Sequence, residues 1–335
     1  MRSSPDDSRA IDEAHAADEP HPEVRAVIDL LESMDAPSLT DLSPEEARAA
    51  TEAMVRDSDI DVARVEDRRI DGPVGEIPIR IYDPAPERAA DGAESRPTIC
   101  YVHGGGWVVG SIDGADSTCR TLATETGYPV VSVGYRLAPE HPFPAGLEDC
   151  YTALEWTARN VDELGGDRDR LVVAGDSAGG NLATATALLT VRRGGPSVAY
   201  QVLVYPVTGD ASETESYDAY GDGYLLSTAE SEWFRNHYFE RELDEWNVLA
   251  APRLASDRLL SSLPPATVVT AGFDPLRDDG AAYADRLADA DVPVTCRNYP
   301  DVIHGFFGML EPPTELTVAH EAHADVAADL HGALE

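Results

Sequence analysis

The sequence predicts an α/β protein whose mostly parallel β-sheet is covered by helices on both faces. Short runs rich in Val and Ile, such as residues 98–104 and 266–272, are apolar without alternation, which is typical of strands buried on both faces. Segments with helical periodicity separate these runs, as the crossover connections of a parallel sheet require. The length of 335 residues suits one large domain, with or without a lid.

The N-terminal part of the chain precedes this alternation. Residues 23–34 and 44–56 show helical periodicity, and Ser43 followed by Pro44 is a helix-start signal. The first 20 residues are polar, and we expect them to be disordered. We therefore predict N-terminal cap helices within residues 1–56 and a main α/β domain over residues 57–335.

Strands and helices then follow in a regular order, with one interruption. Residues 207–262 interrupt the alternation of strands and helices. We expect this insertion to form, together with the N-terminal helices, a helical cap over the carboxyl edge of the sheet. The expected strands are residues 61–70, 76–82, 98–104, 129–135, 170–175, 200–206, 266–272 and 293–299. The expected helices of the main domain are residues 114–126, 145–160, 178–192, 277–290 and 314–333.

The charge of the chain is unusual in its sign. Charged residues make up 26%, but 62 acidic residues face 25 basic ones, which gives a net charge of −37. All of the basic residues are arginine, and lysine is absent. Such a surface repels nucleic acids and anionic membranes, so we expect neither as a partner. The composition is similar to that of proteins from salt-accumulating halophiles, with an acidic protein from a GC-rich genome as the alternative.

The cysteines and the hydropathy pattern bear on metal binding and location. The four cysteines form no C-x-x-C pair and lack zinc-ligand spacing, so we expect buried thiols in a reducing compartment and no metal site. The first 20 residues contain no apolar core of a signal peptide, and no run of about 18 apolar residues occurs. These features predict a cytoplasmic protein without a membrane span. The cysteines are Cys100, Cys119, Cys150 and Cys296.

A candidate nucleophile lies where an expected strand becomes an expected helix. The residues from Gly175 to Gly179, GDSAG, match the pattern G-x-S-x-G. Such a turn strains the backbone at Ser177 and leaves no room for side chains two residues before and after it. It also presents the amide of Ala178 at a helix N-terminus, which favours negative charge. A loop that merely contains a serine is the alternative.

A glycine-rich segment upstream predicts hydrogen-bond donors for a developing oxyanion. The residues HGGGW, 103–107, follow an expected strand, and consecutive glycines let backbone amides approach a substrate closely. We expect the amides of Gly104, Gly105 and Ala178 to be these donors. His103 precedes them on the strand end, so we expect a structural role for it. A phosphate-binding loop would need G-K-[ST] or G-x-G-x-x-G, and neither occurs here.

Five motifs in order resemble those of the hormone-sensitive-lipase family of α/β-hydrolases. This resemblance covers residues from about 70 to 310. It implies an N-terminal cap, a mainly parallel eight-stranded sheet, a Ser-Asp-His triad, hydrolysis of short- to medium-chain acyl esters without metal or cofactor, and frequent pairing into homodimers. The motifs are HGGGW (103–107), YRLAPEHPFPA (135–145), GDSAGG (175–180), DPLRDDG (274–280) and HGF (304–306).

The family order Ser, Asp, His leads to His304 as the base. It follows the last expected strand, next to Gly305. Three other histidines follow the inserted segment, on a C-terminal helix that we expect to present them on a solvated face. His237, within the inserted segment, is expected to be a packing or surface residue. The three helical histidines are His320, His323 and His331.

Asp274 is the expected acid because it follows a strand of the same sheet and matches the family motif. Asp followed by Pro275 is also a helix-start signal, and a carboxylate has two oxygens that could serve both purposes. Asp278 and Asp279 fall within the following helix and are expected to point away from the site. Asp301 is the second choice.

These residues together predict a serine carboxylesterase acting on a small-molecule ester. Trp107 and Phe306 are candidate pocket residues, with a position in the core as the alternative. An amidase or lactonase with the same triad is one alternative function. A ligand-binding receptor on the same fold is another, although all three triad positions are filled.

The charge generates a test of the halophile hypothesis. We expect the melting temperature and activity to rise with added KCl, because the Debye length falls from about 10 Å at 0.1 M salt to about 3 Å at 1 M. Thermal melts and assays across a KCl series measure this effect. Full activity and an unchanged melting temperature without added salt would contradict it.

Overall fold

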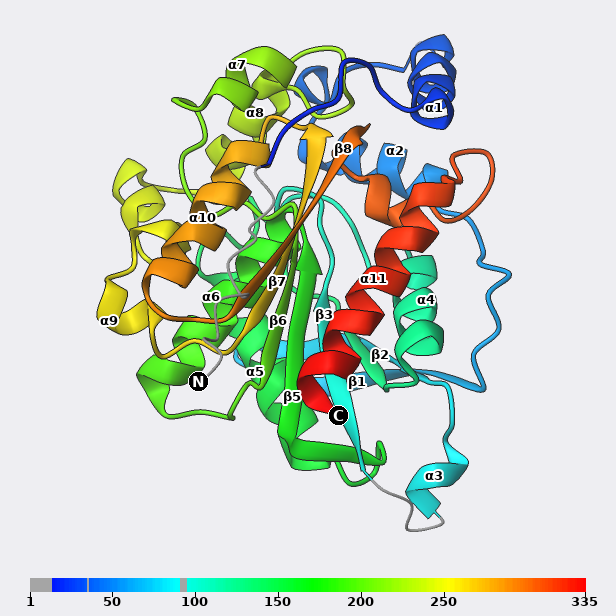
Figure 1. The fold of residues 1–335 in the computed structure, drawn as a ribbon, viewed down its shortest axis with the longest axis vertical. Helices are drawn as coiled ribbons and strands as arrows, with labels where there is room; N and C mark the ends of the chain where they lie inside the picture. The colour runs from blue at the N-terminus through cyan, green and yellow to red at the C-terminus, as the bar shows by residue number, and fades with distance from the viewer. Residues whose placement is uncertain (1–13, 35, 91–94) are drawn as a thin grey trace, which may run out of the picture.

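The computed structural model describes residues 14–34, 36–90 and 95–335, and its centre is an eight-stranded sheet (Figure 1). The strand order is β1-β2-β4-β3-β5-β6-β7-β8. Strand β2 is antiparallel to both of its neighbours, β1 and β4, and the pairs formed by the other six strands are parallel. The predicted mostly parallel eight-stranded fold is therefore confirmed. The strands are β1 (Arg64–Gly72), β2 (Gly75–Asp83), β3 (Arg96–Val102), β4 (Val130–Val133), β5 (Gly166–Asp176), β6 (Tyr200–Val204), β7 (Ala266–Phe273) and β8 (Val294–Ile303).

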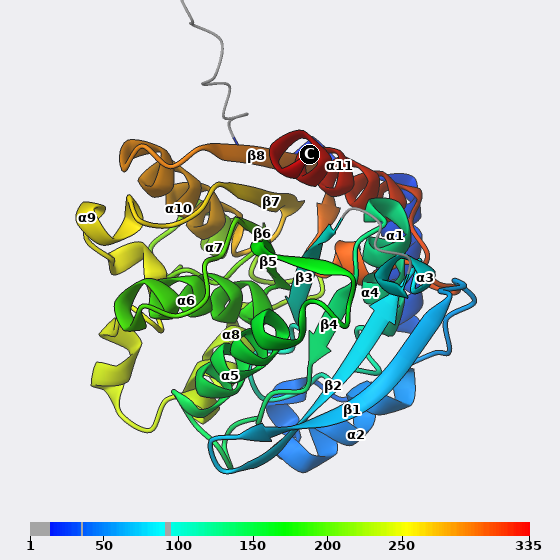
Figure 2. The same cartoon turned by 90° about the horizontal axis from the view of Figure 1, so that it is seen from below.

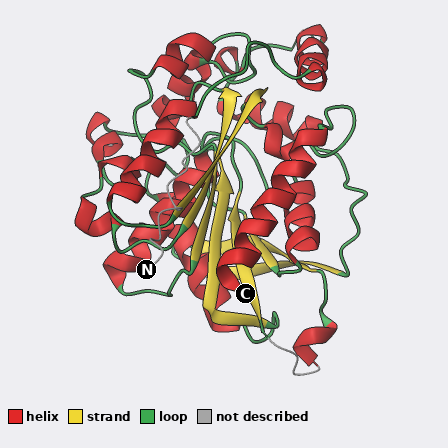
Figure 3. Ribbon diagram, in the orientation of Figure 1, coloured by secondary structure: helices red, strands yellow, loops and turns green. Residues whose placement is uncertain are grey.

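Helices cover both faces of this sheet, as Figures 2 and 3 show. Successive residues of a strand enter two separate cores: Leu171 and Val173 of β5 pack on one face, and Val172 and Ala174 pack on the other. This period of two, with both faces apolar, explains why the strand sequences do not alternate. The covering helices are α5 (Ala145–Asn160), α6 (Ala178–Arg193) and α10 (Arg277–Asp289) on the first face, and α4 (Asp116–Thr126) and α11 (Thr317–Leu334) on the second.

Further helices gather beyond the carboxyl ends of the parallel strands (Figure 1). They come from the N-terminal part and from the inserted segment, residues 207–262. Helices α2 and α8 begin with capping boxes, made by Ser43 with Glu46 and by Ser227 with Glu230. The helices are α1 (Pro22–Ser33), α2 (Pro44–Met54), α7 (Glu215–Tyr220) and α8 (Thr228–Tyr238). The short α9 (Asp257–Leu260) lies away from this group, just before the start of β7, and the short α3 (Glu87–Ala90) lies between β2 and β3 (Figure 1).

The expectation of disorder over the first 20 residues falls mainly on residues 1–13, which lie outside the described residues. Residues 14–20 differ from that expectation because they run beside β8. The amide of Ala17 donates to the carbonyl of Pro300 at 2.8 Å, and the amide of His21 donates to the carbonyl of Asp301 at 2.8 Å. These backbone bonds hold the segment before α1 against the edge strand.

The structure bears on the cysteines and on the hydropathy of the helices. All four cysteine thiols are buried. Over the described ranges 14–34, 36–90 and 95–335, no helix combines the length and the apolar character needed to span a membrane.

The expectation of three solvent-facing histidines on the last helix is wrong for His323. Its side chain is fully buried in α11 and stacks on Phe307, with ring centroids 3.7 Å apart. Nδ1 donates to the carbonyl of Ala319 at 2.9 Å, while Nε2 is buried without a partner among the described residues. Burial therefore lowers the pKa of His323 from 6.5 to about 3.

His323 should make the protein sensitive to mild acid. Below pH 6.5 the unfolded chain binds a proton at this residue that the folded chain does not bind until about pH 3. Its contribution to stability is therefore complete above pH 6.5 and is lost as the pH falls toward 3, by about 2 kcal/mol at pH 5. We expect His323→Leu to weaken the fall in unfolding free energy between pH 7 and pH 5, measured by urea denaturation. His320→Gln, at an exposed position, should leave that fall unchanged.

Candidate active site

Ser177 occupies a strained turn between β5 and α6. Its φ of 54° and ψ of −120° lie outside the regions that residues with a side chain normally adopt. A Cβ atom at Gly175 would lie 2.4 Å from the carbonyl oxygen of Gly179, and one at Gly179 would lie 2.1 Å from that of Val102. The two glycines are therefore needed for close approach of backbone to backbone.

Three predicted residues meet at the carboxyl edge of the sheet. Nε2 of His304 lies 3.0 Å from Oγ of Ser177, and Nδ1 of His304 lies 2.7 Å from Oδ2 of Asp274. With Nδ1 donating to the carboxylate, Nε2 is left as an acceptor for the serine hydroxyl. The three groups form one continuous chain of hydrogen bonds.

Asp274 serves two purposes with its two oxygens. It is fully buried at the end of β7, and Oδ1 accepts from the amide of Leu276 at 2.8 Å while Oδ2 faces His304. The carboxylate of Asp274 does not cap α10, because the N-cap of that helix is Leu276 and no side chain caps it. The bond from the amide of Leu276 instead closes the turn before α10, while Oδ2 is the oxygen that faces His304. Asp301, the second choice, lies within β8 and is not the partner of Nδ1 of His304.

The glycine loop, residues 103–107, differs from the expectation at Gly104. The amide of Gly104 donates to Oδ1 of Asp176 at 3.0 Å, so it is not free to meet an oxyanion. Within the part of the chain that the structure describes, the amides of Gly105 and Gly106 donate to no other group. The amide of Ala178 lies at the first position of α6, where a helix leaves its N–H groups unpaired.

His103 has the expected structural surroundings. It is buried, its Nδ1 lies 2.8 Å from the carbonyl oxygen of Gly104, and its ring stacks on Tyr135 with centroids 4.4 Å apart. Burial lowers the pKa of its imidazole. The hydroxyl of Tyr135 in turn donates to the carbonyl of His103 at 3.1 Å.

A small cavity of about 50 Å³ opens beside Ser177. Trp107 lines it, as expected. Phe306 does not: it is fully buried in the core beside Tyr205 and Tyr299, which corrects its assignment to the pocket. The inserted segment supplies most of the wall. The lining residues are Gly106, Trp107, Ser177, Val207, Gly209, Ala211, Tyr217, Leu226, Ser231, Phe234, Arg235 and Leu276.

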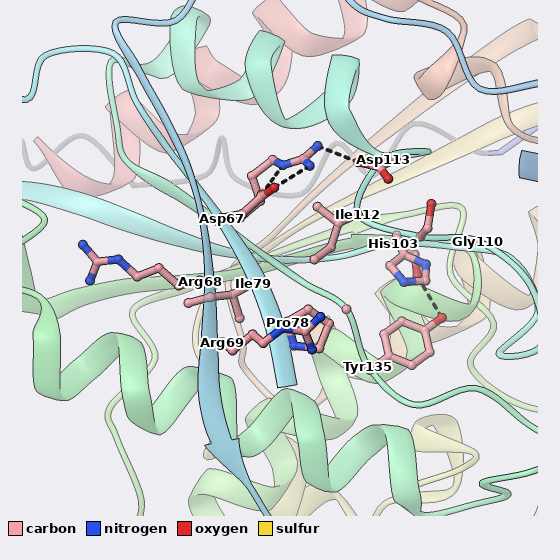
Figure 4. A pocket seen from close by; sticks show the side chains of 13 residues that line it. Asp67, Arg68, Arg69, Pro78, Ile79, His103, Gly110, Ile112, Asp113 and Tyr135 are labelled. Carbon is pink, nitrogen blue, oxygen red and sulfur yellow. Dashed lines mark hydrogen bonds and ion pairs between the residues drawn. The ribbon is translucent and has the colours of Figure 1, made fainter. Parts of the chain in front are cut away.

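A larger hollow of about 640 Å³ lies next to the glycine loop but contains none of the three hydrogen-bonded residues (Figure 4). Its lining residues come from β1, from β2, and from residues 103, 110–113, 134 and 135. Arg80 in this hollow is paired with Asp67 at 2.6 Å and Asp113 at 2.8 Å. Ser177 lines the smaller cavity and not this hollow.

Sequence reasoning missed residues that shape the site. Asp279, expected to point away, is fully buried, and Oδ2 accepts the amides of Thr208 at 2.6 Å and Gly209 at 3.2 Å. It thereby anchors the start of the inserted segment beside the cavity, and burial raises its pKa. The ring of Tyr205 lies 4.5 Å from that of His304. Tyr205 lies in none of the five motifs, and Asp279 lies within DPLRDDG, whose sequence does not indicate that its partners are residues 208 and 209.

The described residues contain no cluster of three or more His, Cys, Asp or Glu arranged to hold a metal ion. The Nε2 atom of His320 lies 3.2 Å from Oε1 of Glu315, but within the described ranges no third potential metal ligand lies beside this pair.

The anchor of the glycine loop at Asp176 generates a stability test. Oδ1 of Asp176 accepts from the hydroxyl of Tyr101 at 2.6 Å as well as from the amide of Gly104. We expect Asp176→Ala to lower the unfolding free energy by about 1–3 kcal/mol, because it leaves donors without an acceptor. Asp176→Asn keeps an acceptor oxygen and should stay close to the wild type in the same denaturation experiment. An equal loss in both variants would point to the charge rather than the hydrogen bonds.

Comparisons with known proteins agree with this architecture. Residues 99–308 match a family model described as alpha/beta hydrolase fold. Among curated proteins, Esterase LipI of Mycobacterium tuberculosis is 42% identical over 245 residues, which cover 73% of this chain and 75% of LipI. Carboxylic ester hydrolase LipN of the same organism is 39% identical, and the match covers 74% of this chain but 65% of LipN, less than two thirds of its length.

Solved structures extend the likeness over nearly the whole chain. The ester-hydrolase EH1AB1 from the metagenome of Lake Arreo, complexed with a derivative of bipyridine phosphonate, has a TM-score of 0.86 at 39% identity, covering 93% of this chain and 98% of its own. The hyperthermophilic esterase from Pyrobaculum calidifontis has a TM-score of 0.85 at 39% identity, covering 94% and 98%. The chain therefore belongs to the alpha/beta hydrolase family, and the resemblance drawn from its motifs is confirmed.

Proposed function

We propose that this α/β-hydrolase is a serine carboxylesterase that cleaves short- to medium-chain acyl esters through an acyl-enzyme. The hydrogen-bond chain from Asp274 through His304 to Ser177, open to an apolar cavity, is the observation that carries the proposal. The names of the relatives, esterase and carboxylic ester hydrolase, support the same reaction class.

Ser177 acts as the nucleophile in this mechanism. Its oxygen attacks the ester carbonyl carbon while His304 takes the hydroxyl proton at Nε2. Asp274 keeps the other ring nitrogen protonated and stabilises the imidazolium that forms. The carbonyl π electrons move to the oxygen, which becomes the oxyanion of a tetrahedral intermediate.

The intermediate then collapses and the enzyme is regenerated. The C–O bond to the alcohol breaks, and the alkoxide leaves with the proton that His304 returns. Water repeats the attack on the acyl-enzyme, with His304 as base, and releases the carboxylic acid. The catalytic residues are therefore Ser177, His304 and Asp274.

The amides proposed for the oxyanion are those of Gly105, Gly106 and Ala178. Gly106 lines the same cavity as Ser177, and the amide of Gly104 is already committed to Asp176. The helix that begins at Ala178 adds the positive end of its dipole. Preorganised donors of this kind stabilise charge that develops only in the transition state.

The wall of the cavity indicates the substrate class. Val207, Leu226, Phe234 and Leu276 are apolar, and the cavity is small, which favours short acyl groups among the proposed range. Arg235 also lines it, but its guanidinium pairs with Asp210 at 2.9 Å and with Glu245. Among the described residues that line the cavity, no cation is thus left unpaired to meet an anionic substrate.

We also propose the wider organisation predicted from the sequence. Residues 1–56 and 207–262 are assigned to a cap over a catalytic domain within residues 57–335, because α1, α7 and α8 lie beyond the carboxyl ends of the strands (Figure 1). A net charge of −37 and buried thiols support operation in concentrated salt and in the cytoplasm. The homodimer stays a prediction.

A panel of nitrophenyl esters from two to sixteen carbons, assayed in high salt, tests the function. We expect the highest kcat/KM at the short end, and little cleavage of an anilide of the same acid, because an amine leaves less readily than an alcohol. Ser177→Ala should lower kcat by at least about a thousandfold and abolish labelling by a fluorophosphonate. Labelling that persists in Ser177→Ala, or an anilide cleaved faster than the ester, would contradict the proposal.

A further inference from the structure

Helix α8, in the inserted segment, packs against the glycine loop that carries the proposed oxyanion amides. Phe234 and Tyr238 are its two buried side chains. They are four residues apart and therefore lie on one face of the helix. Gly106 and Trp107, which these side chains contact, are far from them in sequence.

Phe234 lies directly on Gly106. A Cβ atom built at Gly106 would be 2.2 Å from both Cγ and Cδ1 of the phenyl ring, so no side chain fits there. Gly106 also has a φ of +56°, which residues other than glycine rarely adopt. The ring thus closes over the Cα atom of a residue whose amide we assign to the oxyanion.

Tyr238 holds the neighbouring residue. Trp107 has a φ of +62°, a genuine outlier for a bulky side chain, and such strain persists only where surrounding contacts enforce it. Its indole stacks on the ring of Tyr238 with centroids 4.4 Å apart and planes only 2° from parallel. Both side chains are almost fully buried.

The end of α8 is itself tied to the main domain. The carbonyl of Tyr238 accepts from the amide of Phe143 at 2.9 Å, just before α5. The rings of Phe143 and Tyr238 also meet edge to face, with centroids 5.9 Å apart. The C-terminal end of α8 is therefore tied to the main domain at the same residue that stacks on the glycine loop.

We propose that Phe234 and Tyr238 are positioning residues that keep Gly106 and Trp107 in the strained conformation that presents the oxyanion amides. The inference rests on the proposed function. Donors stabilise an oxyanion only when they lie about 2.7–3.1 Å from its position, so a small displacement of the loop weakens the transition state. The inserted segment would thus contribute to catalysis as well as enclose the substrate.

Tyr238 gives the cleaner test because, unlike Phe234, it does not line the cavity. We expect Tyr238→Leu to lower kcat by about tenfold or more, with KM within about twofold, and to slow inactivation by a phosphonate in parallel. The acid limb of the pH–rate profile should not move, since Ser177, His304 and Asp274 keep their contacts.

Two controls separate positioning from general packing. Tyr238→Phe keeps the stacked ring and removes a hydroxyl that has no partner among the described residues, so it should retain wild-type kcat. Trp156→Leu truncates a partly buried aromatic side chain of α5 that lies outside the cavity wall, and it should also retain kcat. Wild-type kcat in Tyr238→Leu, or an equal loss in Trp156→Leu, would overturn the inference.

A second variant tests the inference if Tyr238→Leu does not fold. Phe234→Leu keeps the cavity wall apolar but removes the ring that lies on Gly106, so it should lower kcat and slow inactivation by a phosphonate in parallel. Wild-type kcat in Phe234→Leu would overturn the inference. A wild-type enzyme that cleaves no ester would instead refute the proposed function.

Discussion

The strained turn at Ser177 is the constraint on which the surrounding structure depends. Its backbone conformation requires β5 to end and α6 to begin within one residue. That turn brings the start of α6 within contact of the end of β3, where only the glycines at 175 and 179 fit. The amide of Ser177 donates to the carbonyl of Val204 at 2.8 Å, so the neighbouring strand β6 holds the turn in place.

Three buried or half-buried carboxylates organise the loops around this turn. Asp176 accepts the amide of Gly104, Asp274 accepts that of Leu276, and Asp279 accepts those of Thr208 and Gly209. Each carboxylate is thus partnered by backbone N–H groups of a neighbouring loop, so that no buried donor there is left without an acceptor. These three side chains thus fix the loops around the turn through hydrogen bonds to backbone amides.

The two sides of the site are built differently. The hydrogen-bonded chain of Ser177, His304 and Asp274 stands on the rigid ends of parallel strands, where a parallel sheet collects its functional residues. The facing wall comes from the inserted segment, which contacts the glycine loop through aromatic rings. The strand ends and the inserted segment therefore meet at the glycine loop, where Trp107 stacks on Tyr238 and lines the same cavity as Ser177.

The motifs were sufficient to locate the residues of the hydrogen-bond chain because each motif reflects a local requirement. A glycine on either side of Ser177, an acid after β7 and a histidine after β8 are requirements of single turns at strand ends, and strand order brings those ends together. The apolar runs predicted the sheet because a strand that is covered on both faces has apolar residues at successive positions. Thus the fold class and the three residues of the hydrogen-bond chain were accessible from the sequence.

Only the tertiary structure decided which backbone amides remain without an acceptor and which side chains line the cavity. Whether Gly104 can offer its amide depends on Asp176, a residue 72 positions away, and whether Phe306 reaches the cavity depends on how Tyr205 and Tyr299 pack. His323 lies on a helix with several polar residues, yet its ring is buried against Phe307. By itself the sequence determined the strands, the turns and the polar residues at the strand ends, because these depend on residues that are adjacent along the chain. Contacts between distant segments determined donor availability, pocket walls and burial, because those properties belong to pairs of residues rather than to either one.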